Sequence, residues 1–197
     1  MKLERSLVRD AFTYEEYRQL HKDMVDQGRT SGPNQTESLI FFTKLNAKRS
    51  DRLDKHHQLS EETLALLKGK RPKIYWLVLS EVWCADSAQI LPIMAKIVEQ
   101  AKFLSMGLLL RDDYPEVMEQ FLSDGTNSIP KLIAFDEAGE ALYTWGPRPS
   151  GAQAIVDQWK AEGKTRPKDE VMEEVQHWYI ADKGQSIETE LRALLAQ

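Results

Sequence analysis

The sequence contains a single cysteine, Cys84, among its 197 residues. One thiol cannot form an intramolecular disulfide, and it cannot supply the several thiolates of a structural zinc or iron–sulfur site. Glycine and proline are also scarce, at ten and eight residues, which excludes collagen-like and low-complexity chains. No apolar run approaches the roughly 20 residues that cross a bilayer. Charges are spread through the first thirty residues, so we expect a cytoplasmic protein with no membrane segment.

The chain carries no surplus of positive charge. It has 26 Lys and Arg against 31 Asp and Glu, for a net charge of −5. A general nucleic-acid-binding protein gathers many Lys and Arg on one face, so we expect no nucleic-acid partner. The hydrophobic content of 42% is that of an ordinary globular chain, and the length allows one domain with extensions.

The first sixty-nine residues have helical patterns. Thr13 is a typical N-cap for a first helix, whose apolar stripe has spacings of three and four: Tyr14, Tyr17, Leu20 and Met24. Asn34, with Glu37 three places later, resembles a capping box that opens a longer helix. We predict that the inner side of this helix is apolar and consists of Leu39, Phe42, Leu45 and Leu53. A third helix follows Ser60, and residues 1–69 are predicted to form an N-terminal helical extension.

From residue 70 to 163 the pattern alternates between strands and helices. Strands are predicted at 74–79, 107–110, 131–135 and 141–145, and helices at 87–101, at 115–122 and from 150 onward. The last two strands lie close enough to form a hairpin. The order β-α-β-α-β-β-α predicts an α/β fold, a mixed sheet with helices on both faces. Two further helices predict a C-terminal helical extension over residues 164–197.

Three features of this region fall in a specific order. Residues 83–87, Trp-Cys-Ala-Asp-Ser, end the first strand, Pro92 lies eight residues after the cysteine, and Ile129-Pro130 opens the third strand. This order resembles the thioredoxin family, which has Trp-Cys-x-x-Cys, a proline in the following helix and a cis-proline at these places. Gly146 matches a glycine that lines the family's substrate groove. The resemblance covers about ninety residues and implies a thioredoxin-like fold for 70–163.

The resemblance implies that Cys84 is the reactive residue. A cysteine at a helix N-terminus faces free backbone N–H groups, which favour the thiolate. Ser87, one turn later, can donate a hydrogen bond to that thiolate but cannot form a disulfide with it. A mixed disulfide at Cys84 would therefore wait for glutathione or another thiol. Val78 stands where dithiol thioredoxins have a buried carboxylate. We predict Cys84 and Ser87 as the catalytic residues.

The same resemblance implies a substrate-binding side. In the family, the residue before the cis-proline offers its backbone to an extended substrate, and the residue before the cysteine borders the active surface. We therefore predict Trp83, Ile129 and Pro130 as substrate-binding residues. Asp86 opposes the thiolate, an effect that solvent would screen if this carboxylate were exposed. Arg148, after the last strand, is interpreted as structural.

Two functions from different classes fit these residues. The first is a monothiol thioredoxin-like protein, a possible oxidoreductase that exchanges with protein or glutathione thiols and disulfides and uses no cofactor. The second is a non-enzymatic interaction module that keeps the thioredoxin groove for a protein partner. A third, a monothiol-glutaredoxin-like protein bridging an iron–sulfur cluster with glutathione, has Cys-Gly-Phe-Ser where this chain has Cys-Ala-Asp-Ser. His56 and His57 are adjacent on a helix and point to different sides, so we predict no metal site.

Overall fold

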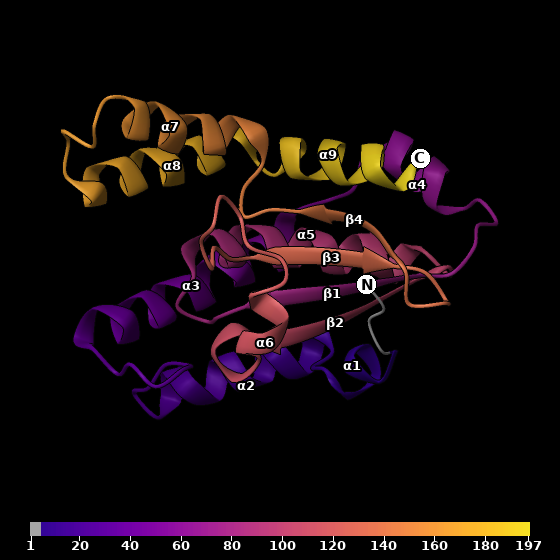
Figure 1. Ribbon diagram of the computed structural model, residues 1–197, viewed down its shortest axis with the longest axis horizontal. Coiled ribbons are helices and arrows are strands. Elements are labelled where there is room, and N and C mark those ends of the chain that lie inside the picture. The colour runs from indigo at the N-terminus through magenta and orange to yellow at the C-terminus, as the bar shows by residue number, and fades with distance from the viewer. Residues whose placement is uncertain (1–4) are drawn as a thin grey trace.

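The computed structural model of the protein describes residues 5–197, in which a central sheet lies between two layers of helices (Figure 1). The strands are β1 (Ile74–Ser80), β2 (Leu104–Leu110), β3 (Lys131–Phe135) and β4 (Ala141–Trp145). The helices are α1 (Arg5–Asp10), α2 (Tyr14–Asp26), α3 (Glu37–His56), α4 (Glu61–Leu67), α5 (Ala85–Gln100), α6 (Pro115–Met118), α7 (Ser150–Ala161), α8 (Lys168–Asp182) and α9 (Gln185–Leu195). A 3-10 turn, η1 (Arg111–Asp113), follows β2. No helix within residues 5–197 has the length and apolarity of a bilayer span.

The sheet has the order β2-β1-β3-β4. β1 runs parallel to β2 and antiparallel to β3, and β3 pairs antiparallel with β4. The β3–β4 turn is closed by the carboxylate of Asp136, which accepts hydrogen bonds from the backbone amides of Ala138 and Glu140 at 2.8 and 2.9 Å. The predicted mixed sheet and hairpin are therefore confirmed.

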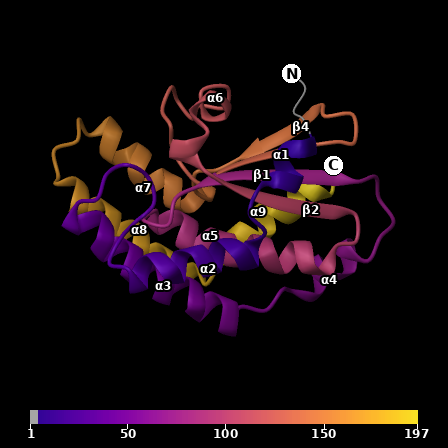
Figure 2. The same cartoon turned by 90° about the horizontal axis from the view of Figure 1, so that it is seen from below.

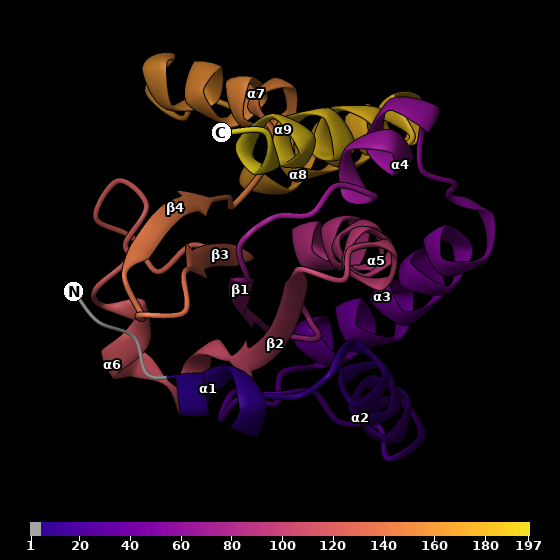
Figure 3. The ribbon, with the colours of Figure 1, turned by 90° about the vertical axis from the view of Figure 1, so that its right-hand side faces the viewer.

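The unbroken apolar run of β1 reflects burial on both faces of the sheet. Trp76 and Val78 point into the larger core, which they share with α5 and with α7, α8 and α9. Leu77 and Leu79 point the other way, into a smaller core with α6 and the end of α1. Figure 3 shows this asymmetry, with most helices stacked on one face of the sheet and α1 and α6 on the other. The face of the sheet that carries the larger core is therefore covered by α5, α7, α8 and α9.

The N-terminal helices begin at two different kinds of cap. Thr13 caps α2 as predicted, and it forms a full capping box with Glu16. The predicted cap of α3 was wrong, because Thr36 and not Asn34 occupies that position. Thr36 directly precedes the helix in an extended conformation, and its hydroxyl accepts a hydrogen bond from the Leu39 amide at 3.3 Å.

The inner face of α3 also differs from the prediction. Its buried residues are mostly polar, namely Thr43, Asn46, Ser50 and Leu53. Asn46 donates a side-chain hydrogen bond to the Val82 carbonyl at 3.2 Å, and Ser50 donates one to the Ala88 carbonyl at 3.2 Å. Phe42, predicted to be internal, is 37% exposed. The helix thus turns its polar stripe toward α5, against which it packs, while α2 lies along its other side (Figure 2).

Candidate functional site

Cys84 lies at the N-cap position of α5, directly after the loop that leaves β1. Its Sγ donates a hydrogen bond to the carbonyl oxygen of Ile129 at 3.3 Å, and the side chain is only 7% exposed. The peptide bond between Ile129 and Pro130 is cis. Three of the residues singled out in the sequence, 46 positions apart at most, therefore meet at one end of the sheet.

The surroundings of Cys84 favour the neutral thiol. Burial raises the pKa of this thiol to about 11, and the nearby carboxylate of Asp86 adds to the rise. Ser87, three residues after Cys84, lowers the thiol pKa, but not enough to offset burial. Its hydroxyl is buried and makes no hydrogen bond within the described residues. An S–H group that donates to a carbonyl is protonated, which agrees with the raised pKa.

Asp86 is buried and held by two other segments of the chain. Its Oδ2 lies 2.7 Å from Nη2 of Arg148, and its Oδ1 accepts a hydrogen bond from the Tyr179 hydroxyl at 3.0 Å. Burial raises the pKa of Asp86, while Arg148 and Tyr179 lower it. Solvent therefore does not screen this carboxylate, and Arg148 is its ion-pair partner. Sequence reasoning missed Tyr179, although its spacing of four from Val175 marks it as part of the inner stripe of α8.

A groove of about 850 Å³ opens beside the thiol. Its lining includes Trp83, Cys84 and Ile129, which the sequence predicted, together with apolar side chains from α3 and Met172 from α8. The α3 residues in this lining are Leu39, Phe41, Phe42 and Leu45. Three of these four were predicted to face the core. Phe41 is 62% exposed and makes an edge-to-face contact with Phe42, at 5.6 Å between ring centroids. α3 thus adds an apolar wall to the groove.

A family model described as "Thioredoxin" matches residues 32–160. The chain belongs to the thioredoxin family. Two solved structures share the fold of this chain. They are a protein of unknown function from Pseudomonas aeruginosa, with a TM-score of 0.59, and an HIV epitope scaffold, with a TM-score of 0.57. Each is 14% identical, with 94% of this chain and 98% of the other covered, which shows the fold alone. No curated protein matches.

In this thioredoxin-family chain, the loop before α5 is tied down by a second buried carboxylate, which sequence reasoning also missed. Glu81 accepts hydrogen bonds from the Ser31 hydroxyl and, at 2.9 Å, from the backbone amide of Asp112. Burial raises the pKa of Glu81, and these two donors lower it. The signal in the sequence is a charged residue placed between a fully apolar strand and the Trp-Cys pair. Glu81 joins the loop to Ser31, which lies between α2 and α3, and to η1.

Trp83 is fixed at the edge of the groove by its neighbour from η1. The guanidinium of Arg111 lies over the Trp83 ring, 5.0 Å from its centroid, and forms an ion pair with Asp112 at 2.7 Å. Nη1 of Arg111 also donates to the backbone carbonyl of Asn127 at 3.2 Å. This cation therefore connects the Trp83 side of the groove with the loop that leads to Ile129.

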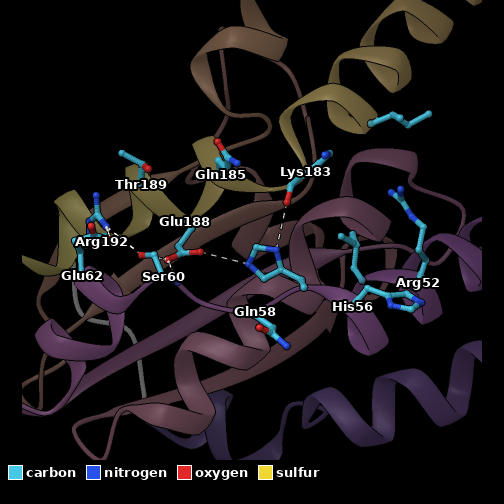
Figure 4. Close-up of a pocket in the computed structure, with 13 residues that line it drawn as sticks. Arg52, His56, Gln58, Ser60, Glu62, Lys183, Gln185, Glu188, Thr189 and Arg192 are labelled. Carbon is cyan, nitrogen blue, oxygen red and sulfur yellow. Dashed lines mark hydrogen bonds and ion pairs between the residues drawn. The ribbon is translucent and has the colours of Figure 1, made fainter.

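A second pocket, of about 830 Å³, shares no lining residue with the Cys84 groove (Figure 4). Ser60, the N-cap of α4, donates a hydrogen bond to Oε1 of Glu188 on α9 at 2.5 Å, and Nε2 of His57 lies 3.4 Å from the other oxygen. Burial alone would raise the pKa of Glu188, but its hydrogen bonds lower it below the usual value. His56 also lines this pocket but is exposed and makes none of these contacts. Within residues 5–197, no three His, Cys, Asp or Glu side chains gather as metal ligands would. The contacts at this pocket join α4 to α9.

Proposed function

We propose that this chain is a thioredoxin-fold binding module that receives an extended segment of a partner protein in the groove beside Cys84. The state of the thiol carries the proposal: Cys84 is buried, donates to the Ile129 carbonyl, and has a pKa raised to about 11. At pH 7 such a thiol is ionised in roughly one molecule in ten thousand, and only the thiolate attacks a disulfide. The sequence also has no second cysteine to release a mixed disulfide. Binding of a partner segment requires neither a thiolate nor a second cysteine.

The walls of the groove support a polypeptide as the occupant. In thioredoxins, the residue before the cis-proline pairs through its backbone with an extended chain, and Ile129 lines the groove at that position. The apolar side chains of α3 stand next to it. A large exposed ring such as Phe41 gains free energy when a bound side chain covers it, about 25 cal/mol for each Å² of apolar surface removed from water.

Peptide binding tests this proposal. Peptides selected from a displayed library are expected to lose at least about tenfold in affinity for a Phe41→Ser variant, because tenfold corresponds to about 1.4 kcal/mol. Leu142→Ser is the matched control, since Leu142 is also an exposed apolar residue, at 47%, but lies on β4 outside the groove. Cys84→Ser is expected to keep the affinity within about twofold, because the serine hydroxyl can also donate to Ile129. Fluorescence anisotropy with labelled peptides measures all four proteins.

Two results would contradict the proposal that the groove binds a partner segment without using the thiol. Equal affinities of the Phe41→Ser and Leu142→Ser variants would place the peptides elsewhere on the surface. A complex that forms with wild-type protein only under oxidising conditions, is lost in Cys84→Ser and is released by reductant would assign the function to the thiol.

The second candidate function is monothiol exchange, and one observation favours it. Cys84 sits at the N-terminus of a sixteen-residue helix and its side chain lines the groove. In this function the Cys84 thiolate attacks one sulfur of a protein or glutathione disulfide, and the other sulfur leaves as a thiolate. The mixed disulfide at Cys84 is then attacked by a glutathione thiolate, which forms a new disulfide with the bound group and frees Cys84.

The pH dependence of alkylation separates the two functions. Because the chain has one cysteine, iodoacetamide reports on Cys84 alone, with Cys84→Ser as the blank. If the binding module is correct, native Cys84 reacts at least about tenfold more slowly at pH 8 than in denatured protein, whose thiol has a pKa near 8.5. If native Cys84 reacts rapidly, with a midpoint below that value, monothiol exchange is the function and the binding proposal is wrong.

A further inference from the structure

We propose that α8 acts on Cys84 through Asp86, and that Tyr179 of α8 is the positioning residue whose hydrogen bond offsets part of the charge of this carboxylate next to the thiol. This role of Tyr179 does not depend on which of the two candidate functions is correct. α8 begins after the end of the thioredoxin family match at residue 160.

Both oxygens of the Asp86 carboxylate are held from outside its own helix. The Tyr179 hydroxyl donates to Oδ1 at 3.0 Å, and Arg148 pairs with Oδ2 at 2.7 Å. Asp86, Tyr179 and the Arg148 side chain are 6%, 2% and 15% exposed. Water therefore screens the carboxylate poorly, and its charge acts on the thiol two residues before it through a medium of low polarity. The Arg148 ion pair keeps the carboxylate in place, and the Tyr179 hydroxyl adds a hydrogen bond to its other oxygen.

α8 is fixed against the rest of the site by two further contacts. Nε2 of Gln89 on α5 donates to Oε1 of Gln176 on α8 at 3.0 Å. The Trp178 ring packs so closely over Gly151 of α7 that a Cβ there would come within 2.6 Å of it. The packing leaves the Tyr179 hydroxyl little freedom to move away from Asp86, which is what a positioning residue requires.

Several charged or titratable groups act on Asp86 and Cys84. Asp86 faces Arg148 from the loop before α7, Tyr179 from α8 and Arg49 from α3. Cys84 interacts electrostatically with Asp86 and Arg148, with Tyr179 from α8 and with Tyr17 from α2. Asp86 disfavours the thiolate, while Arg148 favours it. The hydrogen bond from Tyr179 offsets part of the carboxylate charge, so its removal exposes Cys84 to more of that charge.

The test is the alkylation profile of Cys84 in a Tyr179→Phe variant. The reaction with iodoacetamide at pH 8 is expected to slow about threefold, which corresponds to a rise of about half a unit in the thiol pKa. Tyr143→Phe is the matched control, because the Tyr143 hydroxyl also makes a 3.0 Å hydrogen bond, with Trp76, but has no contact with Asp86. Asp86→Asn is expected to speed the reaction. Tyr179→Phe added to Asp86→Asn is expected to cause no further change, because Tyr179 acts through the carboxylate.

Three results would show that Tyr179 does not act on Cys84 through Asp86. A Tyr179→Phe profile that superimposes on the wild type, or a slowing that persists in the Asp86→Asn background, would overturn the proposal and leave Tyr179 a packing residue. The same slowing in Tyr143→Phe would also overturn it. If Asp86→Asn does not fold, the comparison of Tyr179→Phe with Tyr143→Phe decides alone. The measurement needs no partner protein, so its failure is distinct from a failure of the proposed binding function.

Discussion

Replacement of Asp86 by asparagine is expected to lower the free energy of unfolding by about 3 kcal/mol, as is typical when one partner of a buried ion pair is removed. The variant leaves the guanidinium of Arg148, with 15% of its side chain exposed, without the carboxylate that lies 2.7 Å away. An amide accepts a hydrogen bond but brings no compensating charge. Urea unfolding followed by circular dichroism measures the loss, and the slope of the transition should stay unchanged.

A surface ion pair provides the control for this prediction. Arg166 and Glu174 lie 3.0 Å apart, with side chains 41% and 49% exposed. Glu174→Gln is expected to cost less than about 1 kcal/mol, because water solvates both charges and the side chains lose entropy in pairing. Equal losses in the Asp86 and Glu174 variants would show that burial adds nothing to the Asp86–Arg148 pair. A domain with an ordinary stability of about 5 to 15 kcal/mol stays folded after either change.

The strands could be predicted from the sequence almost to the residue. The observed β3 and β4 span residues 131–135 and 141–145, the predicted ranges, and β1 extends the predicted range by one residue. These segments are short, apolar and bounded by turn residues, so local chemistry alone defines them. β2 begins three residues earlier than predicted, at Leu104, because its first residues are mixed in polarity and their pairing with β1 is a tertiary effect.

The orientation of α3 shows where local patterns stop being informative. The helix has an apolar stripe and an adjacent stripe of small polar residues, and hydrophobicity favours the first as the inner one. The structure turns the second inward, because Asn46 and Ser50 find carbonyl partners in the loop before α5 and in its first turn. Those partners lie 36 and 38 residues away in sequence. The apolar stripe is then free to line the groove.

At the candidate site too, some features could be predicted from the sequence and others could not. The thioredoxin resemblance placed Cys84 beside Ile129, and the two residues lie in contact. The partners that set the local charge could not be read from the motif, since Tyr179 is 93 residues from Asp86. Nor does the motif show that Asp86 is buried, because burial depends on the C-terminal extension that covers it. The functional roles assigned to these site residues stay predictions.

Substitution of Gly146 by alanine is expected to be as costly as the change at Asp86, with a loss of about 3 kcal/mol or more. Gly146 has φ +106°, a region that L-residues rarely adopt, and a Cβ would lie closer than 3.0 Å to the carbonyl oxygen of Pro130. The clash is with backbone, which cannot rotate away as a side chain does. Thermal and urea unfolding measure the loss.

Gly125→Ala separates the two contributions to this cost, because Gly125 also has a positive φ, +71°, but no atom lies within 4 Å of a Cβ built there. It is expected to cost about 1 kcal/mol, the typical penalty for an L-residue in the left-handed region. Similar losses for the two alanine variants would contradict a steric role for Gly146.

If Gly146→Ala folds, Pro130 has to shift, and Ile129 moves with it. Cys84 then loses its carbonyl partner and some of its burial, so the variant is expected to alkylate faster than the wild type. The absence of a side chain at Gly146 would thus keep the Ile129 carbonyl against a neutral thiol.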